Sequence, residues 1–348
     1  MKKLWLVLIA FVLVLAACGN GSDSNSDKNK KETKSYTLDS GKKVEIPKNP
    51  ERIASVAPTY APGLKYLGAN LVAVSDQVEQ SDVIKDKFKG VEKVGENDVE
   101  KVAKTKPDLI IAYSTDKNIK KYKKIAPTVV FDYGKHDYLD QQQELAKIVG
   151  KEKEQQKWEK EWKAKTKKDG EQIQNKIGKD ATVTIFDEFD KKLYTYGENW
   201  GRGGEVLYQA FGLKMPDKVK SLTEKEGWAE IKQEKMADYA GDYIVSTSQG
   251  KAEPSYQSTD LWKNIPAVKN DQVIKINATS YWYNDPYTLE FMRKDLKEKL
   301  LASFMAFEER VDVQATLHDV RTEALKNFEN KGFPTKKEEA WKYTSLNA

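Results

Sequence analysis

The stretch that decides the fold is Lys151–Ile177, KEKEQQKWEKEWKAKTKKDGEQIQNKI, which is almost wholly charged and amide residues and contains no proline. Its sparse apolar residues include Trp158 and Trp162, which stand one helical step apart. This composition predicts one long, mostly exposed helix, with Gly170 as a candidate break. A polar helix of this kind suits a linker between two lobes, and we assign residues 151–178 to it.

Short apolar runs of strand character lie on both sides of this helix. Before it they are Ile53–Ala57, Leu71–Val74, Leu109–Ala112 and Thr128–Phe131, and after it they are Val183–Phe186, Tyr243–Ser246 and Val273–Ile276. Helical or turn-rich residues separate each run from the next, which is the layout of an α/β domain. The sequence therefore predicts two α/β lobes, residues 36–150 and residues 179–300.

An internal repeat supports this division, because each lobe carries the pattern Glu-x7-Asp followed by an apolar strand. The pattern begins at Glu100 in the first lobe and at Glu234 in the second. An acidic residue is favoured where a helix begins, so each glutamate predicts a helix start that leads into a core strand. The two glutamates either cap their helices and do no more, or mark a docking face shared by both lobes.

The amino terminus predicts export. Lys2 and Lys3 precede an uninterrupted apolar run, Leu4–Ala17, which is shorter than the ~20 residues that a membrane-spanning helix needs. Cys18 is the only cysteine and completes a sequence, LAAC, that resembles a bacterial lipobox. We expect residues 1–17 to be a signal peptide, and Cys18 to be lipidated and to anchor the protein on the extracytoplasmic face of the cell membrane. The alternative is an ordinary cleaved signal peptide with an incidental cysteine.

Residues 18–35 contain Gly, Ser, Asn, Asp and Lys without apolar periodicity, which predicts a flexible tether.

The net charge of +5 is spread over 59 basic and 54 acidic residues, so most charges belong to an interleaved, solvated surface. We therefore expect no nucleic-acid partner.

Motifs of the common enzyme classes are absent from the sequence. It has no nucleotide-binding glycine fingerprint, HExxH or GxSxG, and its two histidines, His136 and His318, are widely spaced. We expect no catalytic residue, no metal ion bound directly by the protein and no resident cofactor.

Three segments resemble known families of binding proteins. Val99–Ile111 resembles the signature of the class III substrate-binding proteins of iron-siderophore and cobalamin ABC importers. Leu193–Glu205 and Tyr281–Tyr287 resemble the ferric-hydroxamate-binding lipoproteins of staphylococci, and the likeness runs from Met1 to about Leu300. The resemblance implies two Rossmann-like α/β lobes joined by one long rigid helix, with the ligand in a shallow cleft between them. It also implies a monomer that captures iron(III)-hydroxamate siderophores and delivers them to an ABC permease.

The same resemblance implies the ligand-binding residues. Trp200 and Arg202 correspond to the pair that grips the ligand, Tyr194 lines the same pocket, and Tyr283 is a further wall residue. A ferric trihydroxamate presents oxygens and apolar linkers, which suit a guanidinium and aromatic rings respectively. Because Trp200 and Arg202 are two residues apart, an extended loop would point their side chains the same way. The iron is expected to arrive inside its chelator.

Two more tyrosines are candidates from their positions alone. Tyr113 and Tyr133 each end or follow a predicted strand, where the ligand sites of α/β sheets gather, although either could pack a loop instead.

For Glu100 and Glu234 the resemblance favours docking, because this family meets arginines of its permease with one glutamate from each lobe.

Other ligands and another class of protein stay open. The same fold serves haem, cobalamin and catecholate siderophores, although a strongly anionic tricatecholate would need several clustered cations and the motif offers one arginine amid aromatic rings. A surface adhesin, which needs no enclosed cleft, is the alternative from another class.

Residues 301–348 do not fit the binding-protein resemblance. Lys331–Tyr343 resembles instead the amino-terminal segment of the D component of the SUF iron-sulfur cluster assembly system. The stretch Asp295–Leu300 could belong to either parent, so the tail predicts a chimera, from gene fusion or from a join in sequence assembly. Phe304, Phe307 and Val311 stand at helical spacing, but we assign the tail no function.

Overall fold

The computed structural model describes residues 32–248, 252–311 and 322–326. Cys18, His318 and Lys331–Tyr343 lie outside the described residues. Strand β1 begins at Thr33, so residues 33–35, which were assigned to the tether, belong to the amino-terminal lobe.

The amino-terminal lobe is built on a five-stranded parallel sheet of order β5-β4-β3-β6-β7, next to a hairpin of two strands. The hairpin is β1 (Thr33–Thr37) and β2 (Lys43–Pro47), and the sheet strands are β3 (Ile53–Ser55), β4 (Leu71–Ser75), β5 (Glu92–Val94), β6 (Leu109–Tyr113) and β7 (Thr128–Phe131). Its α-helices are α1 (Ala61–Tyr66), α2 (Val99–Lys104), α3 (Ile119–Tyr122) and α4 (Tyr138–Val149). All four runs predicted as strands in this lobe form sheet strands.

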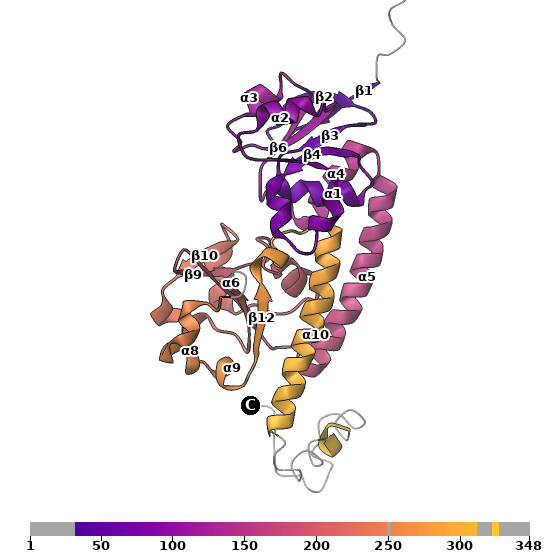
Figure 1. The fold of residues 1–348 in the computed structure, drawn as a ribbon. Coiled ribbons are helices and arrows are strands. Elements are labelled where there is room, and N and C mark those ends of the chain that lie inside the picture. Colours follow the sequence, from indigo (N-terminus) through magenta and orange to yellow (C-terminus); the bar gives the residue numbers. More distant parts are fainter. Residues whose placement is uncertain (1–31, 249–251, 312–321, 327–348) are drawn as a thin grey trace, which may run out of the picture.

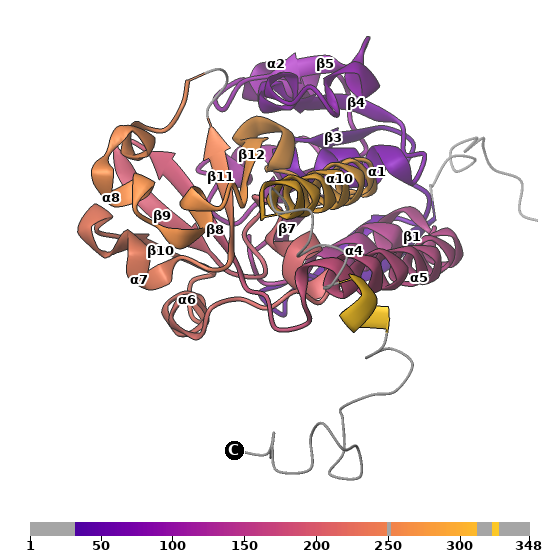
Figure 2. The ribbon, with the colours of Figure 1, turned by 90° about the horizontal axis from the view of Figure 1, so that it is seen from below.

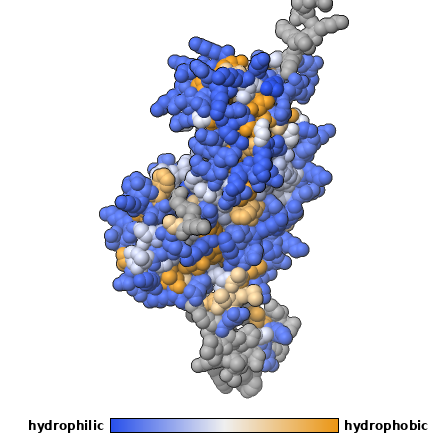
Figure 3. All heavy atoms as spheres, viewed as in Figure 1, coloured by the Kyte–Doolittle hydropathy of each residue, from blue (hydrophilic) through white to orange (hydrophobic). Residues whose placement is uncertain are grey.

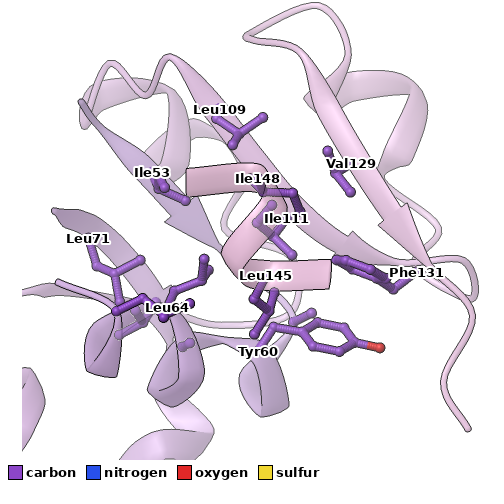
Figure 4. Close-up of a cluster of buried hydrophobic side chains, with 14 of the residues drawn as sticks. Ile53, Tyr60, Leu64, Leu71, Leu109, Ile111, Val129, Phe131, Leu145 and Ile148 are labelled. Atoms are coloured by element: carbon purple, nitrogen blue, oxygen red, sulfur yellow. The ribbon is translucent and has the colours of Figure 1, made fainter. Parts of the chain in front are cut away.

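The core of this lobe lies between the sheet and its helices (Figure 4). Leu109, Ile111 and Val129 of β6 and β7 are wholly buried, and Leu145 and Ile148 of α4 pack in the same cluster. Strands buried in this way are near-continuous apolar runs, which is why the sequence revealed them.

The carboxy-terminal lobe contains a mixed sheet of order β10-β9-β8-β11-β12. Its strands are β8 (Val183–Phe189), β9 (Lys192–Tyr196), β10 (Trp228–Ile231), β11 (Tyr243–Ser248) and β12 (Val273–Asn277), and its short α-helices are α6 (Asp217–Thr223), α7 (Met236–Tyr239), α8 (Asp260–Lys263) and α9 (Pro266–Lys269). Strands β8, β11 and β12 are parallel, whereas β9 runs antiparallel to β8 and to β10. The three predicted runs are thus the parallel strands.

The aspartate of the repeat accepts the same kind of hydrogen bonds in each lobe. Asp108, just before β6, accepts the backbone N–H groups of Glu51 and Arg52 at 3.0 and 2.9 Å, beside the start of β3. Asp242, just before β11, accepts the backbone N–H and the hydroxyl of Thr182 at 2.7 and 2.8 Å, beside the start of β8. Each aspartate therefore fixes the start of the neighbouring parallel strand.

The predicted linker is α5 (Glu152–Ile177), and it continues through Gly170 without a break. A side chain at Gly170 would meet the carbonyl oxygen of Phe211 at 2.2 Å, so glycine lets the helix approach the carboxy-terminal lobe closely.

A second long helix, α10 (Pro286–Val311), lies beside part of α5, whose other end lies beside α4 (Figures 1 and 2). α5 is the helix that connects the lobes, as the sequence predicted, and α10 packs against it and also contacts α1 of the amino-terminal lobe. α10 continues past Leu300, and Leu301 packs partly buried against the carboxy-terminal core. The first residues assigned to the tail thus extend a helix that packs on the carboxy-terminal lobe.

The face of the molecule shown in Figure 3 is mainly hydrophilic, with apolar residues in small separate areas. Among the described helices, none is both long and apolar enough to cross a membrane.

Candidate functional site

A cavity of about 520 Å³ lies where the two lobes meet, and we call it the interlobe cavity. Most of its amino-terminal wall comes from the carboxyl ends of the parallel strands: Val56 and Pro58 follow β3, Gln77 follows β4, Glu96 follows β5, Tyr113 ends β6 and Tyr133 follows β7. Ligands of parallel α/β sheets bind at this edge, where the strand order reverses. Arg202, Trp282 and Tyr283 complete the wall from the rest of the chain.

A row of aromatic rings runs from the amino-terminal lobe to the other lobe. Tyr60 and Tyr113 meet edge to face with ring centroids 5.4 Å apart, Tyr113 and Tyr133 at 5.8 Å, and Tyr133 and Trp200 at 5.1 Å. The Tyr113 hydroxyl lies 2.6 Å from Thr59 Oγ1, which fixes the ring. Both tyrosines chosen from their strand-end positions therefore line the cavity.

Trp200 does not line the interlobe cavity. It lines a neighbouring cavity of about 460 Å³, and Tyr133 lines both cavities. The backbone explains why Trp200 and Arg202 do not point the same way: φ is 76° at Gly201, 57° at Arg202 and 90° at Gly203, so this loop is not extended. The expectation of a shared direction was wrong, because it assumed an extended loop.

Arg202 is held from several sides. Its backbone N–H donates to the carbonyl of Tyr281 at 2.9 Å, and its guanidinium carbon lies 4.8 Å from the centroid of the Tyr196 ring. Its Nε donates to Oδ2 of Asp187 at 3.1 Å, and 16% of its side chain is exposed. Asp187 is a site residue that the sequence analysis missed, because a lone aspartate inside a strand carries no motif.

Glu205 holds the backbone of the same loop through a hydrogen bond. It is buried, and its Oε1 accepts the backbone N–H of Gly201 at 2.8 Å. Its Oε2 has no hydrogen-bond partner among the described residues. Burial raises the pKa of the Glu205 carboxyl above its usual range, which favours the neutral form.

Tyr283 and Trp282 form the far wall of the cavity. Tyr283 is 3% exposed, and its hydroxyl donates to the backbone carbonyl of Gln77 at 3.1 Å, which connects the two lobes. Trp282, which was not selected, also lines the cavity, and its Nε1 is buried without a partner in the described part of the chain. It stood inside the resembling segment Tyr281–Tyr287, which was the one signal for it.

Tyr194 lies apart from both cavities described above. It is half-buried on β9, and its ring meets that of Trp228 edge to face at 5.6 Å. The pocket role that the resemblance implied for Tyr194 stays a prediction.

The two glutamates of the repeat are exposed. Glu100 lies in the first turn of α2 and follows β5, and Glu234 lies in the short helical turn Gln233–Lys235 and follows β10. β5 and β10 are each an edge strand of their sheet, so the two positions correspond.

No group of three or more histidine, cysteine or acidic side chains with the geometry of a metal site occurs in the described ranges. His136 is paired with Asp39, with Nε2 to Oδ1 at 2.7 Å.

The comparisons with known proteins match this architecture. A family model described as periplasmic binding protein matches residues 53–279, which is more than half of the chain. The iron(3+)-hydroxamate-binding protein FhuD of Bacillus subtilis is 37% identical over 310 residues, covering 86% of this chain and 98% of that protein.

Two solved structures are more similar in sequence. FhuD2 from Staphylococcus aureus with bound ferrioxamine B is 66% identical, with a TM-score of 0.72, covering 73% of this chain and 100% of that chain. The FhuD protein from S. pseudintermedius is 53% identical, with a TM-score of 0.75, covering 78% of this chain and 99% of that chain.

A second family model, described as the SufBD protein N-terminal region, matches residues 294–348. This match agrees with the resemblance stated for the tail, and it begins inside α10.

Proposed function

Because this chain belongs to the periplasmic binding protein family, we propose that it is a membrane-anchored receptor that binds iron(III)-hydroxamate siderophores and delivers them to an ABC permease. The observation that carries the proposal is the interlobe cavity, whose lining combines aromatic rings, among them Tyr113 and Tyr133, with one arginine. The rings suit the apolar linkers of a hydroxamate chelate, and the guanidinium suits its oxygens.

The charges of the cavity favour a hydroxamate over a catecholate complex. Deprotonated hydroxamates balance the charge of iron(III), whereas a tricatecholate complex is strongly anionic. The charged residues that line the interlobe cavity are Glu96, Asp116 and Arg202, so acidic side chains outnumber basic ones. An anionic chelate would meet like charge there, which costs affinity.

A partly open cavity of this size also favours a small-molecule receptor over a surface adhesin. Drug-sized ligands are typically held in clefts of about 300 to 1,000 Å³, and the interlobe cavity of about 520 Å³ lies within that range. We propose that iron enters it only inside the chelator.

Replacement by alanine of Arg202, which lines the interlobe cavity, or of Trp200, whose ring packs on the lining residue Tyr133, is expected to weaken binding of ferrioxamine B by roughly 10-fold or more, because aromatic and arginine anchors carry most of the free energy of binding. Isothermal titration calorimetry measures this without relying on tryptophan fluorescence. Trp158→Ala is the matched control, because Trp158 lies on α5, is only partly buried and lies outside both cavities. Unchanged affinity in both variants, or saturable binding of haem or a ferric catecholate in place of ferrioxamine B, would contradict the proposal.

We propose that Glu100 and Glu234 dock the loaded receptor on the permease. Both are exposed, correspond in the two lobes, and have no ion-pair partner among the described residues. Charges at the rim of an interface mainly set orientation and the rate of association, which suits a protein that must also dissociate.

The double variant Glu100→Lys with Glu234→Lys should therefore lower uptake of radioactive iron from ferrioxamine B by cells several-fold, while the purified protein keeps its affinity for the chelate. Glu298→Lys, a charge reversal at an exposed position of α10, serves as the control. Normal uptake by the double variant would remove the docking role.

We also propose that Cys18 carries the lipid anchor. With Cys18→Ser, the protein should move from the membrane fraction to the medium and lose incorporation of labelled fatty acid, because acyl chains supply the stable membrane attachment. Ser24→Ala, a change nearby that leaves Cys18 in place, should stay in the membrane fraction. Retention of label by Cys18→Ser would show that the anchor lies elsewhere.

We propose that the segment after about Leu300 derives from a second protein and takes no part in ligand capture. Tyr283 is the last residue in the sequence that lines the interlobe cavity. From there α10 runs along and past the carboxy-terminal lobe (Figure 1). A chain ending at Val311, which keeps α10 complete, should bind ferrioxamine B with the affinity of the full chain, measured by calorimetry. Several-fold weaker binding would give the tail a role in capture.

A further inference from the structure

Asp187 is a wholly buried carboxylate on β8, directly behind the interlobe cavity. Its Oδ2 accepts from Nε of Arg202 at 3.1 Å and from the hydroxyl of Tyr196 at 3.2 Å, and its Oδ1 accepts from Oγ1 of Thr247. The donors come from the loop after β9, from β9 itself and from β11. A buried charge satisfied on both oxygens in this way is held in one position.

This arrangement determines how Arg202 meets a ligand. Its Nε is taken by Asp187, its plane rests against the ring of Tyr196, and its backbone is fixed by Tyr281. Across the described ranges, no hydrogen bond engages either terminal amino group of the guanidinium. Arg202 therefore presents fixed N–H donors to the cavity, and these match chelate oxygens.

The pair of Asp187 and Arg202 also sets the net charge beside the interlobe cavity. Asp187 and Arg202 form an ion pair in which the carboxylate is wholly buried and the guanidinium is mostly so. Glu205 is the other buried carboxyl beside this loop, and burial favours its neutral form. The positive charge of Arg202 is thus cancelled by Asp187, and the lining residues Glu96 and Asp116 add negative charge.

We propose that Asp187 is a specificity-determining residue that keeps Arg202 as an oriented donor while cancelling its charge, so that the cavity accepts uncharged or cationic iron(III) hydroxamates and discriminates against anionic ones. The inference rests on the proposed function, because it concerns the same site. Asp187 acts through Arg202 and is a positioning residue that does not touch the ligand.

A matched series of ligands tests this directly. Ferrioxamine B carries a free amine at one end of its chain; acetylation removes the positive charge, and succinylation replaces it with a negative one. Calorimetry gives the dissociation constant of each for the wild-type protein and for Asp187→Asn, which keeps the shape of the side chain and removes its charge. The ratio of the constants for the succinylated and free-amine forms reports charge discrimination alone.

In the wild-type protein we expect the succinylated form to bind more weakly than the free amine. In Asp187→Asn this ratio should fall about 5- to 10-fold, because a charge left unpaired in a low-dielectric site acts over a long range. Thr247→Val is the control, because it removes one donor to Asp187 without changing any charge and should leave the ratio unaltered. A purely structural role would weaken all three ligands equally, and an unchanged ratio would overturn the proposal.

A second variant keeps the test decisive if Asp187→Asn does not fold. Asp187→Ser removes the same charge with a smaller polar side chain, so the ratio should fall as it does in Asp187→Asn. Failure of the wild-type protein to bind any of the three ligands would contradict the proposed function itself. Binding of all three with ratios insensitive to both substitutions would contradict only the role of Asp187.

Discussion

The arrangement of the two lobes depends on the contact between α5 and α10. Asp169 of α5 is 5% exposed and pairs with Arg293 and, at 2.6 Å, with Lys297 of α10. Loss of its partners would leave a charge buried without compensation, which is costly. Two helices joined in this way resist bending more than one helix, so the walls of the interlobe cavity keep their relative positions.

A cavity with fixed walls lowers the cost of binding. The row of rings through Tyr113, Tyr133 and Trp200 already spans the lobes, and Tyr283 already bonds to Gln77 across them. Little side-chain ordering remains when a chelate enters, so more of the contact energy is available as affinity. The guanidinium of Arg202 is likewise held in place without any ligand, by Asp187 and by the ring of Tyr196.

Much of the fold could be predicted because its central strands are buried on both faces. The seven apolar runs named from the sequence all lie in the two sheets, and the polar linker forms α5. The strands that were not predicted are β1, β2, β5, β9 and β10, which are short or keep exposed residues. Edge and hairpin strands of this kind lack a continuous apolar run, so the hydropathy of the sequence does not distinguish them from loops.

The sequence by itself determined the two lobes, the polar helix between them, the repeat of Glu100 and Glu234, and the strand-end tyrosines Tyr113 and Tyr133, because these follow from local composition and periodicity. The tertiary structure decided that Trp200 and Arg202 face different cavities, since the positive φ angles from Gly201 to Gly203 turn the loop. It alone paired Asp187 with Arg202 and with Thr247, which is 60 residues further along the chain. Such contacts depend on how strands pair and loops turn, and neighbouring residues in a sequence do not encode them.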